Sequence, residues 1–360
     1  MTDDPYIFSR SLVQIRPSGL RGERWRIEAD LQALWYRGDY LSSAEWDLLS
    51  PQLSGNTRHS WERLWASSKD SEFRGQIWRL YGAFEIGPME IAVGRMRNAF
   101  GNTRIFLSPL DRLDVLPALI SQSGDRPGSE TLRLGGRSGE SWRWQGGYLW
   151  GRGASDERGF FHTQYLVREG LETEFLLART WPQTQTLGLG LEYSVGEGEI
   201  RWQATWNKAR QERLTLDAST FPPALKTETA EPKFSRHLFA WEKAYGGDWL
   251  VAVEYQRNGL GEAVPERYDI SRLLGGQDLY LARDYAGFYI QRQLTPLWKL
   301  ALQQTSGLTD RGFAWTPEVS CESAGSSLEA KLRSSFYFGP TPSEFGRLPN
   351  RIQLALSLYF

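Results

Sequence analysis

Charged side chains at alternating positions are the residues of this sequence with the clearest chemical potential. Arg26, Glu28 and Asp30 alternate with Ile27 and Ala29, so a strand here has one charged face and one apolar face. Charges of both signs would be costly in a dry core, but along a water-filled passage they can replace part of a solute's hydration shell. The predicted pore-lining or constriction residues are Arg26, Glu28, Asp30, Arg79, Glu85, Arg95, Arg97, Arg104, Asp111, Arg112, Arg143, Glu192, Arg201, Glu254, Lys299, Glu329, Lys331, Arg333 and Arg351.

Nucleophilic catalysis would need a base beside a serine or cysteine, and the sequence offers three histidines: His59, His162 and His237. His162, in Phe-Phe-His-Thr-Gln-Tyr, lies near the end of a predicted strand, where a barrel hydrolase could place its base. No serine has a distinguishing context. We therefore interpret His162 as an interfacial strand histidine without a catalytic role, and we expect no enzyme; a barrel hydrolase is the weaker alternative.

Cofactor and nucleic-acid chemistry find little support in the composition. Cys321 is the sole cysteine, which excludes an intramolecular disulfide and a cysteine metal cluster. The sequence has no Cys-x-x-Cys-His motif for covalent haem and no calcium-loop pattern, so we expect no cofactor. A net charge of −1 argues against nucleic acid as the main partner.

The elements that would position these charges are β-strands with one apolar face. The stretch 351–360 alternates without a break, and its apolar stripe ends at Phe360. Trp25 and Trp35 lie at the two ends of another such stripe, about 25 Å apart along a membrane normal, as an aromatic girdle requires. Similar stripes recur along the chain, including one that would place Trp78 on the outer face, and no run approaches 18 apolar residues. The pattern predicts an all-β protein, a transmembrane antiparallel β-barrel of about 16 strands (14–18).

The connections alternate in length, which is a second feature typical of such barrels. Short turns such as Glu169-Gly170 alternate with long links such as 38–72, 98–130 and 209–235. Short periplasmic turns and long extracellular loops are expected of an outer-membrane barrel, and an even strand count places both termini on the periplasmic side. The weakest strand predictions are 131–136 and 312–319.

Domain organisation follows from these strands. We expect an N-terminal arm over 1–23 and a single barrel over 24–360. The link 98–130 is both apolar and charged, so we expect it to fold into the lumen as a constriction; an outer loop capped by its own apolar cluster is the alternative. A bulge near Gly94 would turn Arg95 and Arg97 inward.

The two ends of the sequence bear on export. The start, Met-Thr-Asp-Asp-Pro, lacks the basic and apolar regions of a signal peptide, so we expect the sequence to be the mature part of an exported protein. The last strand, 351–360, resembles the C-terminal signal strand of bacterial outer-membrane barrels, which finishes in Phe.

A family resemblance rests on the hairpin around Gly94. The run Val93-Gly94-Arg95, then Gly101, Pro109-Leu110-Asp111 and Pro127-Gly128, is similar to a pattern in porin-like barrels of the alginate-export type. That family typically has a Gly-Arg-Gln run and a Trp-Gly pair here, whereas this sequence has Met96 and Phe100-Gly101. The resemblance implies an outer-membrane conduit; the family's arginine-rich lumen is replaced here by mixed charge.

We therefore expect a bacterial outer-membrane channel for passive passage of hydrophilic solutes or polysaccharide. Its expected partners are outer-membrane lipid, the solute or polymer and a possible periplasmic protein, with no nucleic acid. The main alternative is a barrel sheath or scaffold for a periplasmic or multihaem electron-transfer partner, and a soluble all-β protein is a further one.

Overall fold

The structure is a computed structural model of the 360-residue chain. It describes residues 9–16, 20–42, 46–47, 50, 58–114, 127–151, 153, 156–180, 183–209, 211–217, 224–268, 280–323, 328–341, 343–348 and 350–359.

In the described part of the chain almost all regular structure is β-strand, and the named helical elements are short 3-10 turns. No helix among the described residues is long and apolar enough to cross a membrane. The elements are β1 (Ser9–Arg16), β2 (Trp25–Arg37), η1 (Asp39–Ser42), β3 (Glu62–Ser68), β4 (Ser71–Ile86), β5 (Met89–Met96), β6 (Ser129–Ser138), β7 (Trp142–Leu149), β8 (Arg158–Arg168), β9 (Leu171–Thr180), β10 (Thr184–Val195), β11 (Gly198–Lys208), β12 (Gln211–Asp217), β13 (Ala224–Ala230), β14 (Lys233–Tyr245), β15 (Trp249–Asn258), η5 (Pro265–Arg267), β16 (Asp284–Gln293), β17 (Trp298–Gly307), β18 (Phe313–Glu322), β19 (Leu328–Phe338), η6 (Phe345–Arg347) and β20 (Arg351–Tyr359).

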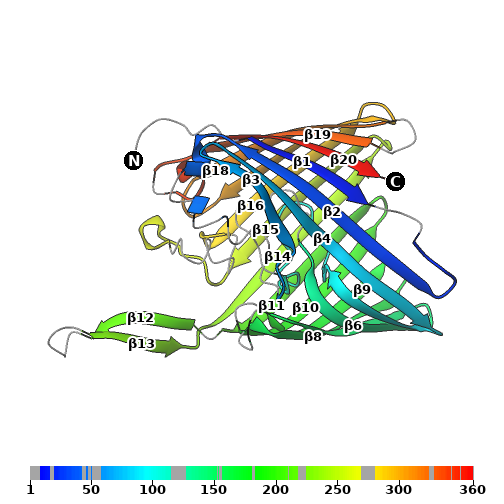
Figure 1. The fold of residues 1–360 in the computed structure, drawn as a ribbon. Coiled ribbons are helices and arrows are strands. Elements are labelled where there is room, and N and C mark those ends of the chain that lie inside the picture. The colour runs from blue at the N-terminus through cyan, green and yellow to red at the C-terminus, as the bar shows by residue number, and fades with distance from the viewer. Residues whose placement is uncertain are drawn as a thin grey trace.

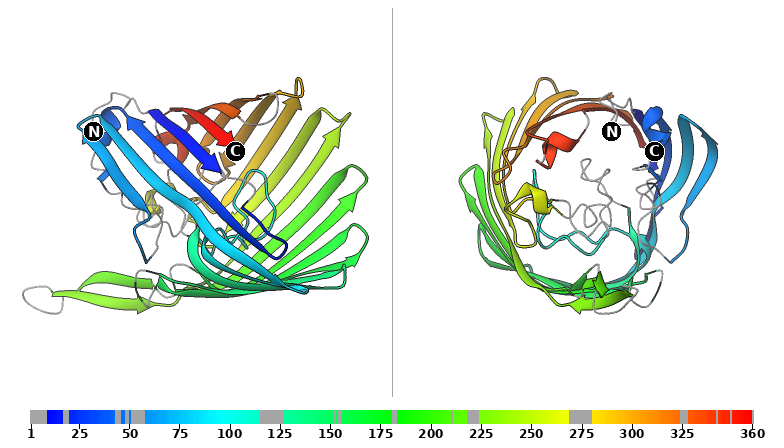
Figure 2. Two further views of the ribbon diagram at one scale, coloured as in Figure 1. Left: turned by 45° about the vertical axis from the view of Figure 1, so that its right-hand side comes forward. Right: turned by 90° about the vertical axis from the view of Figure 1, so that its left-hand side faces the viewer.

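The strands form a closed barrel, which confirms the predicted fold class (Figures 1 and 2). The sheet contains 18 strands, and 17 of them make up the closed wall. The remaining strand, β3, pairs with the first part of β4. The two weakest predicted strands, 131–136 and 312–319, are real and appear as β6 and β18. Within the long link predicted over 209–235, β12 and β13 form a hairpin that projects from the barrel (Figure 1).

Closure of the barrel differs from the prediction. β1, inside the segment expected to be an arm, is part of the wall: it pairs antiparallel with β2 and parallel with β20. The strand count of the wall is therefore odd, and the expectation of an even count with both ends on the short-turn side is wrong. Because β1 and β20 run in the same direction, the start of β1 and the end of β20 lie at opposite ends of the barrel.

The alternation predicted from the sequence sets the two faces of the wall. On β2, Trp25 and Trp35 are 48% and 51% exposed on the outer face, whereas Asp30, Gln32 and Leu34 point inward and are buried. Large apolar side chains are exposed along the outer face of the other strands too. An apolar outer surface on a closed sheet fits a bacterial outer-membrane location.

Trp78 was placed on this outer face by its phase, and that prediction is wrong. The register between β2 and β4 shifts between Asp30 and Leu31, because Asp30 lies opposite Arg79 whereas Leu31 lies opposite Ile77. The extra residue, Trp78, is 1% exposed in a cluster with Leu34, Tyr36, Leu41 and Trp46. A bulge in β4 thus turns this side chain inward.

Candidate functional site: the lumen and its inner belt

The segment Arg97–Asp114, which follows β5, runs along the inside of the wall; we call it the inner belt (Figure 2). Its outgoing limb first packs Phe100 on His162 of β8, with ring centroids 4.4 Å apart. Farther round, the backbone N–H groups of Arg104 and Phe106 donate to the Glu254 carboxylate of β15 at 2.6 and 2.8 Å. The limb therefore reaches about half-way round the barrel from β5.

The return limb contacts strands in the reverse order. Ser108 donates to Gln203 of β11 at 2.6 Å, and Arg158 of β8 donates to the Leu113 carbonyl. Asp114 then accepts a 2.5 Å hydrogen bond from Ser129 at the start of β6. Since both limbs bind the wall, the inner belt is held in place along its length.

Two inward glycines make room for the inner belt. A Cβ at Gly188 would lie 2.4 Å from Leu110 Cδ2, and a Cβ at Gly287 would lie 2.5 Å from Ile105 Cγ2. Any larger side chain at either position would compete with the belt for space. The wall and the belt are thus complementary in shape as well as in hydrogen bonding.

Ion pairs reinforce these contacts. Arg104 binds Glu242 of β14 at 2.8 Å, and Glu242 also lies 3.9 Å from Arg201 of β11. Arg201 itself pairs with Glu192 at 3.3 Å and with Glu199. A chain of alternating charges therefore runs from the belt onto the wall, where each charge has an opposite neighbour.

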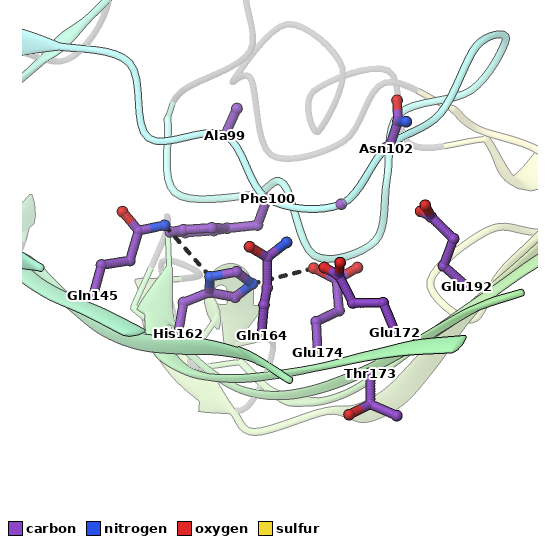
Figure 3. A pocket seen from close by; sticks show the side chains of 11 residues that line it. Ala99, Phe100, Asn102, Gln145, His162, Gln164, Glu172, Thr173, Glu174 and Glu192 are labelled. Carbon is purple, nitrogen blue, oxygen red and sulfur yellow. Dashed lines mark hydrogen bonds and ion pairs between the residues drawn. The ribbon is translucent and has the colours of Figure 1, made fainter. Parts of the chain in front are cut away.

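A polar cavity of about 160 Å³ lies beneath the outgoing limb (Figure 3). The His162 ring forms part of its wall, with Nε2 3.1 Å from Glu174 and Nδ1 3.4 Å from Gln145. Two further carboxylates, Glu172 and Glu192, line the same space. The sequence analysis did not predict His162, Glu172 and Glu174 as lumen residues. Glu172 and Glu174 alternate with outward-facing residues of β9, and this alternation could have identified them.

Charges of both signs also line the wall at β2, β5 and β6. Glu90 accepts from Arg26 at 2.6 Å and from Arg133 at 3.0 Å. Arg26 also lies 3.2 Å from Glu28 and 3.7 Å from Glu85. The predicted inward set of Arg26, Glu28 and Glu85 is thus one network, completed by Glu90 and Arg133.

A second polar cavity of about 160 Å³ lies on the wall formed by β16–β19. Lys299 pairs with Glu322 at 2.6 Å, and Lys331 with Glu329 at 3.1 Å. Arg333 donates to Glu318 at 2.7 Å. The predicted residues on these strands are therefore brought together in neighbouring pairs.

Other predicted residues are buried rather than open to the lumen. Arg95 is 1% exposed; it donates to the Trp78 carbonyl at 3.2 Å, and its guanidinium lies 5.9 Å from the Trp61 ring. The strand register runs past Gly94 without a shift as far as Arg95, so the bulge expected there is found in β4 instead. Gly94 adopts a φ of 132°, which a residue with a side chain rarely adopts.

The remaining predicted residues fall in three places. Arg97 and Asp111 pair within the inner belt at 3.4 Å, and Arg112 is 8% exposed. Asp30 accepts from Gln14 at 2.8 Å, opposite Arg79. Arg143 is exposed on β7. The side chain of Arg351 lies outside the described residues.

No group of three or more His, Cys, Asp or Glu residues in the described ranges could hold a metal ion.

Comparison with known proteins gives structural neighbours only. No protein-family description and no curated protein matches this sequence. The structure is similar to that of Acinetobacter baumannii OccAB2, with a TM-score of 0.54 and 11% identity over 93% of this chain and 87% of that one. It is also similar to Acinetobacter baumannii OccAB1, with a TM-score of 0.53 and 11% identity over 94% and 86% of the two chains. A BenF-like porin from Pseudomonas fluorescens Pf-5 matches with a TM-score of 0.51 and 12% identity over 94% and 87%. The chain therefore has a porin-like barrel fold, and the specific resemblance to the alginate-export type finds no counterpart among these neighbours.

Proposed function

We propose that this chain is an outer-membrane channel for the passive passage of small hydrophilic solutes, in which the inner belt sets the size limit. The observation that carries the proposal is the anchoring of the belt to Glu254, half-way round a closed barrel. A segment held along the inside of the wall by hydrogen bonds narrows the passage without the cost of ordering it for each solute.

The predicted pore-lining residues supply the second support. Charged pairs such as Lys299–Glu322 and Arg26–Glu90 remain partly exposed in the lumen, so they can exchange contacts with each other for contacts with a solute. Mixed charge suits weak, reversible binding, which conduction requires. A polymer such as a polysaccharide would have to thread past the belt. A sheath would have to hold a folded partner beside the belt. A small solute needs the least space in the narrowed lumen, so we favour it.

Conductance across a planar lipid bilayer tests the proposal, using protein refolded in detergent. We expect discrete, long-lived steps, and we expect swelling of protein-loaded liposomes in small sugars to decline as sugar size increases. Insertion without conductance would contradict the channel and would favour the scaffold alternative, which copurification of a haem-bearing partner would then support.

The hydrolase alternative requires an esterase activity that is lost when His162 is substituted. Among the described residues, the His162 ring contacts Glu174, Gln145 and the Phe100 ring, and none of these is the serine, threonine or cysteine that a histidine base would activate.

A further inference from the structure

A row of basic side chains crosses the outer face of the wall at its long-loop end. Arg179 on β9, Lys208 on β11 and Lys233 on β14 are exposed and occupy one cross-strand row, which passes through Gln185 on β10. The strands β9, β10, β11 and β14 are adjacent in the sheet, and the β12–β13 hairpin leaves the barrel beside Lys208 and Lys233 (Figure 1). We call Arg179, Lys208 and Lys233 the basic row.

The row two residues nearer the membrane centre is apolar. Leu177, Leu187 and Trp206 lie in register with one another on the same face, and they are 56%, 40% and 42% exposed. A basic row directly above exposed Leu and Trp side chains is the pattern expected where hydrocarbon gives way to lipid headgroups.

Within the basic row, like charges are placed together. Lys208 and Lys233 are direct cross-strand partners, an arrangement that is unfavourable unless an anion is present. Glu231 supplies one, 2.7 Å from Lys208, but both side chains are about half exposed, at 45% and 54%. Among the described residues, Glu231 pairs with Lys208 and Glu157 lies near Arg179 through Tyr148, so three cations face fewer carboxylates and the basic row keeps excess positive charge.

The part of the wall formed by β17, β18 and β19 differs. The corresponding positions at this end of β17, β18 and β19 carry Ser306, Phe313 and Phe338, which lie in one cross-strand row and bear no charge. The run of cations in the basic row is therefore not repeated on β17–β19.

We propose that the basic row binds the phosphate groups of lipids in the outer leaflet. The proposal rests on the outer-membrane orientation, with long loops outside, but not on the solute that passes through the lumen. Lys and Arg beside a membrane surface attract anionic headgroups with about 1 kcal/mol each, so each cation contributes about fivefold to binding at low salt.

The test uses the full chain folded in detergent micelles, titrated with lipid A carrying two phosphates and with dephosphorylated lipid A. The thermal unfolding midpoint and bound lipid by native mass spectrometry are the readouts. We expect the phosphorylated lipid alone to bind and to raise the midpoint, with binding that weakens as salt rises. A Lys208→Gln, Lys233→Gln double variant should bind it about 25-fold more weakly. Gln already stands in this row at position 185, so the variant should fold.

Lys243→Gln is the matched control, because Lys243 lies on the same face of β14 as Lys233 but ten positions away, near the short-turn end. Its binding should match that of the unmodified chain, and the conductance of all variants should be unchanged. Equal binding of dephosphorylated lipid, or equal weakening by Lys243→Gln, would overturn the proposal. Displacement of the lipid by millimolar inorganic phosphate would also overturn it, because the site would then recognise free phosphate.

Discussion

The backbone N–H of Arg104 donates a 2.6 Å hydrogen bond to the carboxylate of Glu254, which lies 150 positions later in the sequence. The same carboxylate accepts from the N–H of Phe106, and Glu254 is 1% exposed. One buried side chain on β15 thus holds the far end of the inner belt.

Glu254→Gln should loosen the inner belt, because an amide has only one acceptor oxygen for two backbone donors. We expect a loss of about 1–3 kcal/mol in local stability and a larger single-channel conductance. Glu169→Gln is the control, because Glu169 is exposed in the short turn between β8 and β9, away from the belt and the lumen. Identical conductance in the two variants would contradict the role of Glu254.

Gly188→Val should displace the inner belt by steric overlap. The new Cβ would lie 2.4 Å from Leu110 Cδ2, and Leu110 is fully buried. We expect a destabilisation of about 1–3 kcal/mol together with faster liposome swelling in larger sugars. Gly82→Val is the matched control, because Gly82 also lies in a strand but a Cβ there would meet no atom within 4 Å. Unchanged sugar selectivity in Gly188→Val would show that the belt does not set the size limit.

Trypsin should cut the folded protein slowly at Arg104 and Arg112. The backbone of Arg104 is held by Glu254, and Arg112 is 8% exposed, so neither bond can enter the protease without local opening. Mass spectrometry of timed digests, with heat-unfolded protein as reference, provides the measurement. Cutting at either site within the first minutes would favour an outer loop over a belt inside the barrel.

Charge reversal on the β17–β19 wall should change ion selectivity. Lys299→Glu with Lys331→Glu converts two cations of the second cavity into anions, so we expect the reversal potential in a salt gradient to shift toward cation selectivity. Lys69→Glu, in the exposed turn between β3 and β4, serves as the control. An equal shift in both variants would mean that surface charge and not the lumen is being measured.

Glu344 should make the loop after β19 sensitive to pH. Burial raises the pKa of Glu344 to about 7, although its carboxylate accepts hydrogen bonds from Tyr285 Oη and the N–H of Leu281. The folded state therefore holds a proton that the unfolded state releases near pH 4.5, its ordinary value. Stability should be greatest below this pH, decline as pH rises to about 7, and stay low above it.

Glu344→Gln should flatten this pH dependence, because the amide carries no titrating proton. Urea unfolding in detergent at pH 4.5, 6 and 8 gives the comparison, with Glu322→Gln as the partly exposed reference. A slope between pH 4.5 and 7 that persists in Glu344→Gln would assign it to another group.

The sequence by itself determined the barrel and the two faces of its wall. A period of two residues places every second side chain on one face, so stripes such as Trp25 to Trp35 identify lipid-facing positions without knowledge of the partners. The mixed charge of the lumen follows in the same way from Arg26, Glu28 and their counterparts. The apolar and charged link after β5 also predicted a segment that must pack against something.

Only the tertiary structure decided how the wall closes and what the inner belt contacts. β1 is a short strand whose place depends on pairing with both β2 and β20, at opposite ends of the sequence, and no local pattern reports such pairing. The inward turn of Trp78 depends on a register shift against β2, which alternation along β4 cannot show. Contacts such as Arg104–Glu254 and Leu110–Gly188 join segments that approach one another only once the sheet has curved into a barrel. Their energy depends on that closure, so the sequence could indicate an inserted segment but not the residues that hold it.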